Sequence, residues 1–289
     1  MSKTRMRVLC FLANVLKTVH CPPIRHRHTD SPAPVRHPYP TNPLLSQSVQ
    51  HTARQIVFPS PNEVRVREVH VDPPGSHQLL VQAACSLISA GTEQNLLEGD
   101  YRAANLQEAP DALRPGYSWV GHVLATGSDI SGYSHGDRVI AGLQHVSTAL
   151  IPSENRPTTR LEVPEKLPDS ISDEAATFVS LADVSLHAVR RASPYIGDAV
   201  AVWGAGVVGQ LIVQFARMAG AYPVIAVDLD NERLNVARIS GATHTVNAGE
   251  DDAVAAVRTA TNGNGARAVF MATRTPRVLP DCMQAADNG

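Results

Sequence analysis

The residues with the clearest chemical role belong to the stretch GAGVVG, which begins at Gly204. This stretch directly follows an apolar, strand-like run and opens a segment with helical spacing. Gly204 allows a tight turn, Gly206 lets backbone N–H groups approach a pyrophosphate, and Gly209 lets the helix pack close to the strand. The first N–H groups of that helix, including those of Val207 and Val208, are free to bind phosphate oxygens. The spacing therefore predicts a dinucleotide-binding loop.

An acidic residue indicates which dinucleotide to expect. Asp228 ends the next apolar run, PVIAVD. A carboxylate at that place accepts hydrogen bonds from the hydroxyls of the adenine ribose and repels a 2′-phosphate. We therefore expect NAD(H) rather than NADP(H). The alternative, a glycine turn that binds no nucleotide, is weak because strand, loop, helix and acid occur together.

Two kinds of sequence pattern surround these residues. Over residues 52–170, short apolar or alternating runs such as EVRVREVHV and WVGHVLATG are separated by turns rich in proline and glycine, which predicts a β-rich domain. Over residues 171–289, nearly continuous apolar runs alternate with segments of helical spacing. That alternation predicts an α/β domain with a doubly wound parallel sheet.

Composition limits the function classes. The chain is 43% hydrophobic and 18% charged with a net charge of −2, which is typical of a globular protein and implies no general attraction to nucleic acid or anionic membranes. No apolar run has the length of a membrane-spanning helix. The four cysteines form no CxxC motif, so a disulfide framework or a structural zinc site is not expected. We expect a cytoplasmic protein with a small-molecule substrate and with neither nucleic acid nor membrane as a partner.

Residues 1–51 differ from the rest of the sequence. They are rich in proline and histidine and show no helical or strand period, so we expect a disordered N-terminal extension. A basic start and a short apolar stretch resemble a signal peptide in outline, but Asn14 and Lys17 interrupt the apolar stretch and no cleavage site follows. A start codon assigned too far upstream would explain the segment equally well.

Several stretches together resemble the medium-chain dehydrogenase/reductase superfamily. They are GDRV (residues 136–139), VPEKLPDSISDEAA (163–176) and VWGAGVVGQLIVQFARMAGA (202–221). ADVSLHAVRRA is most similar to the polyol and threonine dehydrogenase branch, and LISAGTE is similar to the bacteriochlorophyllide dehydrogenase-like branch. The resemblance implies a GroES-like first domain, a Rossmann second domain, and a cleft between them where the substrate meets the nicotinamide.

The same resemblance implies roles for two further residues. The family often has a basic residue five positions after the ribose-binding acid, which places Arg233 near the adenosine; the alternative is an ordinary exposed helix residue. Asp183 is expected near the nicotinamide ribose, with a helix cap as the alternative. Members of the family are homo-oligomers, and the last strands of the second domain often make the subunit contact.

Many members of the family bind a catalytic zinc ion, and this chain lacks the ligands that the resemblance would supply. The position of the first cysteine ligand falls at Ser89 or Ala90, the His-Glu pair falls at Tyr117 and Ser118, and the third ligand falls at or next to Ser180. A neutral hydroxyl is a poor Zn²⁺ ligand beside thiolate, imidazole or carboxylate. We therefore expect no metal site.

Without zinc, another group must stabilise the substrate oxygen. One hypothesis is that Tyr117 donates a hydrogen bond or a proton to that oxygen, since a phenol with an ordinary pKa of about 10 suits a donor better than a base. Ser89, Thr92 and Glu93 are candidate relay partners, and His145 is a weaker candidate. The competing hypothesis makes Tyr117 an aromatic wall without a proton role.

The sequence ends after the strand-like run ARAVFMAT and one more helix. The last two strands of a six-stranded dinucleotide fold are therefore missing, and we expect a truncated chain with weakened cofactor binding, doubtful activity and a doubtful subunit contact.

The leading interpretation is a zinc-independent, NAD(H)-dependent oxidoreductase that transfers a hydride to or from a small alcohol or carbonyl, polyol-like substrate. One alternative is a reductase of activated C=C bonds of the quinone or enoyl type. Asp228 argues against this reading because such relatives mostly use NADP(H). The other alternative is a non-catalytic, NAD-binding remnant.

Overall fold

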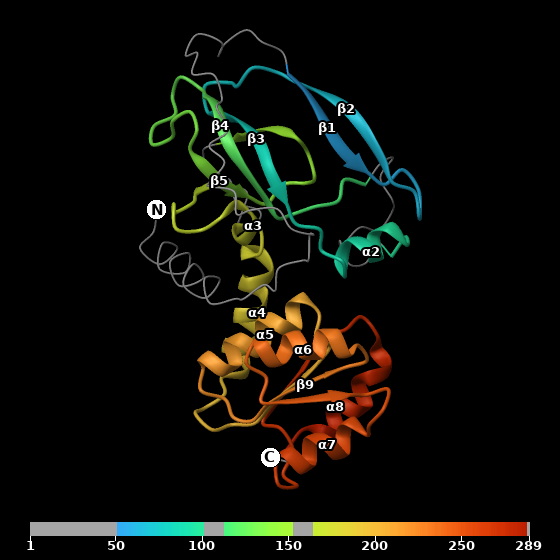
Figure 1. The fold of residues 1–289 in the computed structure, drawn as a ribbon. Helices are drawn as coiled ribbons and strands as arrows, with labels where there is room; N and C mark the ends of the chain where they lie inside the picture. Colours follow the sequence, from blue (N-terminus) through green and yellow to red (C-terminus); the bar gives the residue numbers. More distant parts are fainter. Residues whose placement is uncertain (1–50, 101–112, 153–163, 288–289) are drawn as a thin grey trace, which may run out of the picture. The chain divides into compact units, whose positions relative to one another are not determined.

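The computed structural model describes residues 51–100, 113–152 and 164–287 (Figure 1). These residues fall into two compact units, the first ending at Phe178 and the second beginning at Val179. None of the helices in these segments is both long and apolar enough to cross a membrane.

The predicted N-terminal extension, residues 1–51, lies outside the described residues with one exception. His51 was expected to end the extension, but it is the first residue of a strand that continues to Val57. The predicted boundary between residues 170 and 171 lies just before the first helix that follows the β-rich segment, whereas the division into compact units comes after that helix.

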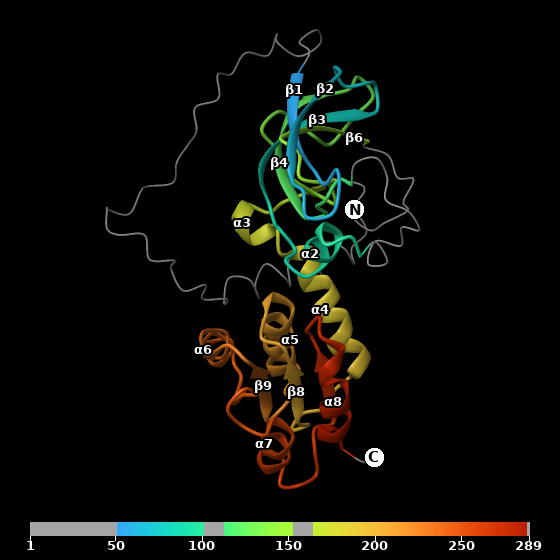
Figure 2. The same ribbon diagram turned by 90° about the vertical axis from the view of Figure 1, so that its right-hand side faces the viewer.

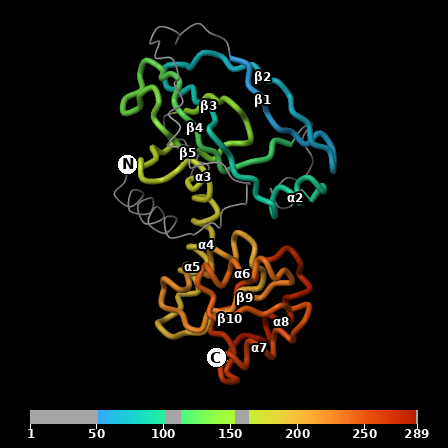
Figure 3. Tube along the Cα trace, viewed as in Figure 1, coloured from blue at the N-terminus to red at the C-terminus, as the bar shows by residue number. Residues whose placement is uncertain are grey.

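The first unit consists mainly of short strands. Its elements are β1 (His51–Val57), β2 (Arg65–Val71), β3 (Gln78–Ser86), α2 (Thr92–Leu97), β4 (Trp119–Thr126), β5 (Arg138–Ala141), β6 (Thr148–Pro152), β7 (Glu165–Lys166) and α3 (Asp173–Ala176). Strands β6, β3, β4, β5 and β7 form one antiparallel sheet in that order. Strands β1 and β2 pair separately, also antiparallel, and run side by side in Figure 3.

The core of the first unit follows from the alternation of side chains along its strands. Leu79 and Val81 on β3 pack with Trp119 and Val123 on β4, and all four are fully buried. Because successive side chains of a strand point to opposite faces, these alternate positions share one face of the sheet. The Trp119 indole N–H also donates to the backbone carbonyl of Val146 at 2.8 Å, so the aromatic ring fixes the segment just before β6.

The second unit alternates strands and helices. Its elements are α4 (Val179–Ala192), β8 (Val200–Trp203), α5 (Val207–Met218), β9 (Val224–Asp228), α6 (Asn231–Ile239), β10 (His244–Asn247), α7 (Ala253–Ala260), β11 (Ala268–Met271), η2 (Pro276–Val278) and α8 (Leu279–Ala285). The strands form a parallel sheet in the order β10-β9-β8-β11, with β8 and β9 side by side at its centre (Figure 2).

Helices cover both faces of this parallel sheet. Ala201 and Ile225 face a core to which α7 and α8 contribute Val257 and Cys282. Helix α5 packs against β8 and β9 and contacts α4 and α6. In Figure 1, α5 and α6 lie on one side of β9, and α7 and α8 lie on the other. The predicted fold class, a β-rich part followed by a doubly wound α/β part, is confirmed.

Candidate functional site

The glycine loop connects β8 to α5 at the end of the central strands. Gly204 has a φ of +99°, a conformation that residues with a side chain rarely adopt. A Cβ at this position would also lie 2.7 Å from the carbonyl oxygen of Ala272. The N–H of Gly204 donates to the carbonyl of Val227 on β9 at 2.7 Å. The tight turn predicted at Gly204 is therefore present.

The other two glycines of the loop have different surroundings. A Cβ on Gly209 would overlap the carbonyl oxygen of Gly204 and would lie 3.5 Å from the side chain of Val202, so only glycine allows α5 to start this close to β8. Gly206 is the N-cap of α5 with an ordinary φ of −72°, and a Cβ on it would meet no atom within 4 Å. Its backbone is compatible with any residue, so the glycine leaves open space for a ligand.

Asp228 ends β9 and binds the glycine loop directly. Its Oδ2 accepts a hydrogen bond from the N–H of Ala205 at 2.6 Å, and its Oδ1 accepts from the N–H groups of Leu229 and Asp230 at 2.8 and 3.0 Å. A carboxylate has about four acceptor positions, so about one remains for a ribose hydroxyl. The Asp228 side chain is only 10% exposed. These bonds hold the carboxylate rigidly at the mouth of the loop.

Two residues assigned from the resemblance also lie in the second unit. Arg233 is 59% exposed on α6; its guanidinium lies 4.0 Å from Asp228 and 3.6 Å from Asp230. Arg233 is thus an exposed helix residue that also stands beside the proposed ribose-binding acid. Asp183 lies inside α4, beyond its first turn, so the alternative of a helix cap for Asp183 is wrong.

In the first unit, the structure brings together two of the candidate relay residues. The Nε2 atom of His145 lies 2.8 Å from Oε2 of Glu93, and both side chains are only 5% exposed. A buried carboxylate needs a charged or hydrogen-bonding partner to be stable. Glu93 and His145 therefore satisfy one another in the interior, although 52 residues separate them in the sequence.

Backbone hydrogen bonds fix both members of this pair. Glu93 lies in the first turn of α2, where its Oε1 accepts from the N–H of Ser89 at 2.8 Å and its own N–H donates to the Ser89 carbonyl. His145 donates its backbone N–H to the carbonyl of Pro115 and accepts at its carbonyl from the N–H of Ile56. Three separate chain segments thus hold the pair in one geometry.

Sequence reasoning missed a third member of this cluster, Ser86. Its Oγ lies 2.8 Å from Nδ1 of His145, on the ring nitrogen that Glu93 does not bind. Ser86 is the last residue of β3 and is only partly buried. Nothing in the residues around Ser86 marks it, because its partner lies 59 residues away and reaches it only through the folded sheet.

Tyr117 and Ser118 lie next to this cluster along the backbone. The carbonyl of Pro115 accepts from the N–H of His145, and the carbonyl of Ser118 accepts from the N–H of Leu87, each at 2.9 Å. Tyr117 is partly buried between these two attachment points. Ser118 is 1% exposed, and its Oγ has no hydrogen-bond partner within the described part of the chain.

The donor groups at the positions of the family's zinc ligands do not fit zinc. Ser89 and Ser118 are buried hydroxyls, Tyr117 is a partly buried phenol, and Ser180 lies in the first turn of α4. Such neutral oxygens compete poorly with water for Zn²⁺. Among the described residues, no group of three or more His, Cys, Asp or Glu side chains could hold a metal ion.

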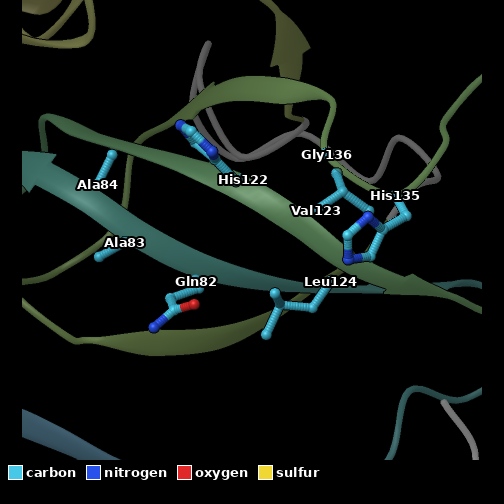
Figure 4. A pocket seen from close by; sticks show the side chains of 8 residues that line it. All are labelled: Gln82, Ala83, Ala84, His122, Val123, Leu124, His135 and Gly136. Carbon is cyan, nitrogen blue, oxygen red and sulfur yellow. The ribbon is translucent and has the colours of Figure 1, made fainter. Parts of the chain in front are cut away.

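A pocket on the first unit is too small for a substrate site of the expected kind. Its volume is about 40 Å³, enough for a few water molecules but far below a nicotinamide site. Figure 4 shows the rings of His122 and His135 apart from one another, with Gln82 on the neighbouring strand. His122 is bound to Asp173 at 3.2 Å, and Arg138 binds the same carboxylate. This cluster joins β4 and β5 to α3.

Each unit contains one cysteine among the described residues, and both thiols are protonated at neutral pH. Burial raises the pKa of Cys85 to about 11, and the carboxylates of Asp173 and Glu174 add to the effect. Burial likewise raises the pKa of Cys282, with a contribution from Asp281. Neither thiol therefore behaves as a reactive thiolate.

Comparison with known sequences relates both units to dehydrogenases. The zinc-binding dehydrogenase family matches residues 207–289. Sorbitol dehydrogenase of Bacillus subtilis is 33% identical over 123 residues, which are 43% of this chain and 35% of that protein. L-threonine 3-dehydrogenase of Deinococcus deserti is 31% identical over 209 residues, 64% of this chain and 59% of that protein. The chain therefore spans less than two thirds of the length of these curated relatives.

Comparison with solved structures relates the fold to the same group. Alcohol dehydrogenase TADH from a Thermus species matches with a TM-score of 0.66 and 25% identity, over 81% of this chain and 74% of that chain. A zinc-binding dehydrogenase of Sinorhizobium meliloti, solved with NADP, matches with a TM-score of 0.70 and 22% identity, over 83% and 75% of the two chains. The second likeness speaks for the fold alone.

Proposed function

Because the chain belongs to the zinc-type medium-chain dehydrogenase/reductase superfamily, we propose that it is an NAD(H)-dependent oxidoreductase. The proposed reaction transfers a hydride to or from a small alcohol or carbonyl substrate of the polyol type, without a zinc ion. The observation that carries the proposal is the glycine loop between β8 and α5, with Asp228 bound to the N–H of Ala205. We further propose a cytoplasmic location, since the cysteines indicate a reducing compartment.

The loop supplies what a dinucleotide needs. The open space at Gly206 admits a pyrophosphate, and the N–H groups of Val207, Val208 and Gly209 at the start of α5 supply hydrogen bonds and the positive end of the helix dipole. When bound, the nicotinamide cofactor supplies the hydride acceptor or donor. Asp228 would accept a hydrogen bond from a ribose hydroxyl at its remaining acceptor position, and Arg233 lies beside it with most of its side chain exposed.

The preference for NAD(H) rests on the charge of Asp228. A 2′-phosphate on the adenine ribose would place two negative groups close together, and such a pair costs up to about 4 kcal/mol near a protein surface. Arg233 offsets part of this repulsion, because its guanidinium lies 4.0 Å from the carboxylate, but it is mostly exposed and shares its charge with Asp230.

The independence from zinc rests on the donor groups of the first unit. Its residues at the ligand positions are Ser89, Tyr117 and Ser118, which supply no thiolate, imidazole or carboxylate. Tyr117 takes the position that the family resemblance assigns to a metal ligand, and we propose that it acts either as a proton donor to the substrate oxygen or as an aromatic wall beside it. The proton chemistry then falls to side chains of the chain itself.

The ratio of NADPH to NADH dissociation constants tests the cofactor proposal. We expect the purified chain to bind NADH more tightly, and Asp228→Asn to lower the ratio about tenfold, equivalent to about 1.4 kcal/mol. Asp251→Asn, which removes an exposed acid elsewhere in the second unit, is the matched control and should leave the ratio unchanged. A wild-type chain that binds NADPH as tightly as NADH would contradict the proposal.

Metal analysis and a substrate panel test the reaction. Oxidation of NADH is measured with ketones and with enones, in the presence and absence of a chelator, and zinc is quantified per chain. We expect turnover with ketones that the chelator does not change. Turnover with enones alone would favour the reductase of C=C bonds, cofactor binding without any turnover would favour a non-catalytic protein, and one tightly bound zinc per chain would contradict zinc independence.

A further inference from the structure

The interior of the first unit contains an unbroken row of three proton-bearing groups. The carboxylate of Glu93 binds Nε2 of His145, and Nδ1 of the same ring binds the hydroxyl of Ser86, each at 2.8 Å. Both hydrogen bonds have the short lengths typical of good geometry. The row begins at a buried carboxylate and ends at a hydroxyl that is partly exposed.

The carboxylate determines how the protons are arranged. An ionised carboxylate can only accept hydrogen bonds, so the Nε2 atom of His145 must carry a hydrogen. In the neutral ring Nδ1 is then an acceptor, and the Ser86 hydroxyl donates to it. In the protonated ring Nδ1–H becomes the donor and the Ser86 oxygen accepts. The two states differ by one proton, and both keep the same two hydrogen bonds.

Burial and backbone contacts prepare the row for this exchange. Glu93 lies ready to stabilise a positive imidazole, and its second oxygen is already held by the N–H of Ser89. Backbone bonds from His145 to Pro115 and from Ile56 to His145 fix the main chain that carries the ring, and Glu93 and Ser86 bind its two nitrogens. A change of protonation therefore requires little rearrangement of the surrounding chain.

The exposed end of the row lies beside Tyr117 and Ser118, the segment where the family resemblance puts the metal-binding His-Glu pair. Ser86 pairs in register with Trp119 on β4, and the next residue, Leu87, donates its N–H to the carbonyl of Ser118. The backbone at Ser86 thus lies next to Tyr117 and Ser118, the residues at the positions of the His-Glu pair. No other group in the row is open to solvent to the same degree.

We propose that Ser86, His145 and Glu93 form the proton relay of this oxidoreductase, with Ser86 as the catalytic residue that meets the substrate oxygen. The inference rests on the proposed function. It gives His145 the role of proton acceptor and Glu93 the role of a positioning and charge-stabilising group. Tyr117 then has the role of an aromatic wall.

The relay balances the protons of the reaction. During alcohol oxidation the substrate C–H bond breaks and its hydride passes to NAD⁺. The substrate hydroxyl gives its proton to the Ser86 oxygen while the Ser86 proton moves to Nδ1 of His145. The products are a carbonyl compound, NADH and a protonated His145 paired with the Glu93 carboxylate. Carbonyl reduction runs through the same bonds in reverse.

Substitution of Ser86 tests the relay directly, because this partly exposed side chain can be changed without opening the buried pair. We expect Ser86→Ala to lower kcat about 100-fold while the KM for NADH stays within twofold, and Ser86→Thr, which keeps a hydroxyl, to restore most of the rate. Ser128→Ala, which removes an exposed hydroxyl elsewhere in the first unit, is the matched control. Tyr117→Phe should retain most of its turnover.

Two outcomes separate this inference from the proposed function. If the wild-type chain turns over alcohols or ketones but Ser86→Ala does so at an unchanged rate, the relay is wrong and the proposed function stands. If the wild-type chain shows no turnover with either cofactor, the proposed function fails and the relay fails with it. A large loss in Tyr117→Phe with a normal rate in Ser86→Ala would also overturn the relay and assign the proton to Tyr117.

Histidine NMR gives a readout that does not depend on turnover. With nitrogen-labelled histidine, the resting ring of His145 should carry its proton on Nε2, and Ser86→Ala should shift the Nδ1 signal while leaving the Nε2–H signal in place. The variant His145→Gln assigns these signals among the 12 histidines of the chain. A resting ring with its only proton on Nδ1 would contradict the proposed hydrogen-bond direction.

Discussion

The glycine loop of the second unit and the relay of the first unit differ in how far apart their residues lie in the sequence. The loop occupies one continuous stretch, and its partner Asp228 lies 23 residues from Ala205. The relay joins Glu93 and Ser86 to His145 across 52 and 59 residues. Both sites depend on hydrogen bonds of similar length, so the difference lies in what brings the groups together.

In the second unit, local geometry determines the residue types. Gly204 needs a positive φ, and Gly209 has no room for a Cβ. Both positions therefore require glycine, and the two glycines appear in the sequence at a fixed spacing. In the first unit, strand pairing brings the residues of the site together. Gln82 pairs with Thr148, and the N–H of Ala83 donates to the Ser147 carbonyl, so the antiparallel register of β3 and β6 carries His145 toward Ser86. Such a site leaves no local motif.

The largest expected effect is a loss of stability in the second unit alone, when the glycine loop is altered. Gly209→Ala forces a Cβ into the carbonyl of Gly204, and we expect it to destabilise the second unit by about 4 kcal/mol or more. Amide hydrogen exchange, resolved by mass spectrometry for peptides of each unit, would show faster exchange in β8 and α5 with little change in β3 and β4. Equal loss of protection in both units would show that the sites are not independent.

Gly206→Ala is the matched control for that experiment. A Cβ on Gly206 meets no atom within 4 Å and φ is −72°, so stability should change by less than about 0.5 kcal/mol. NADH affinity should nevertheless fall, because the methyl group occupies the space proposed for the pyrophosphate. Unchanged NADH affinity would contradict the proposal that the loop binds the cofactor.

The next effect concerns the buried pair of the first unit. Glu93→Ala leaves Nε2 of a buried imidazole without its hydrogen-bond partner, and a buried polar group left unpaired costs about 1–3 kcal/mol. The double variant Glu93→Ala with His145→Ala should cost less than the sum of the two single variants, because each single change already breaks the contact. Urea unfolding, followed through the first unit by exchange of β3 and β6, measures the cycle. Additive losses would show that the pair contributes no coupling energy.

The smallest effect concerns the Cys85 thiol and depends on pH. Because burial raises the pKa of Cys85 to about 11, the folded chain keeps the thiol proton over a range where the unfolded chain loses it. Its contribution to stability is therefore complete below about pH 9 and is lost as the pH rises toward 11. At pH 8 the folded chain should react with iodoacetamide at Cys85 about a hundredfold more slowly than the urea-unfolded chain.

Peptide mass spectrometry separates Cys85 from the other three cysteines in that experiment. Cys282, whose pKa burial also raises, gives the corresponding measurement in the second unit. Rapid labelling of folded Cys85 at pH 8 would contradict the proposed environment of the end of β3. It would also show that the chain around Ser86 is more exposed to solvent than it is in the structure.

Much of the fold was predictable because it follows from short-range pattern. The alternation of apolar residues in β4 and the continuous apolar runs of β8 and β9 predicted a β-rich part and a parallel sheet, and both are present. Local sequence pattern did not predict where helices and strands begin and end. Asp183 lies inside α4 rather than at a cap, and His51 begins β1 instead of ending an extension.

The sequence by itself determined the glycine loop, its acid and the hydroxyls at the zinc positions, because backbone sterics and ligand chemistry act on the residues where they stand. Only the tertiary structure decided that Glu93 binds His145 and that Ser86 completes the row. Serine, histidine and glutamate are common in any sequence, so their presence alone does not indicate a site. They become a relay when strand pairing brings them within 3 Å of one another in an interior where buried polar groups need hydrogen-bond partners.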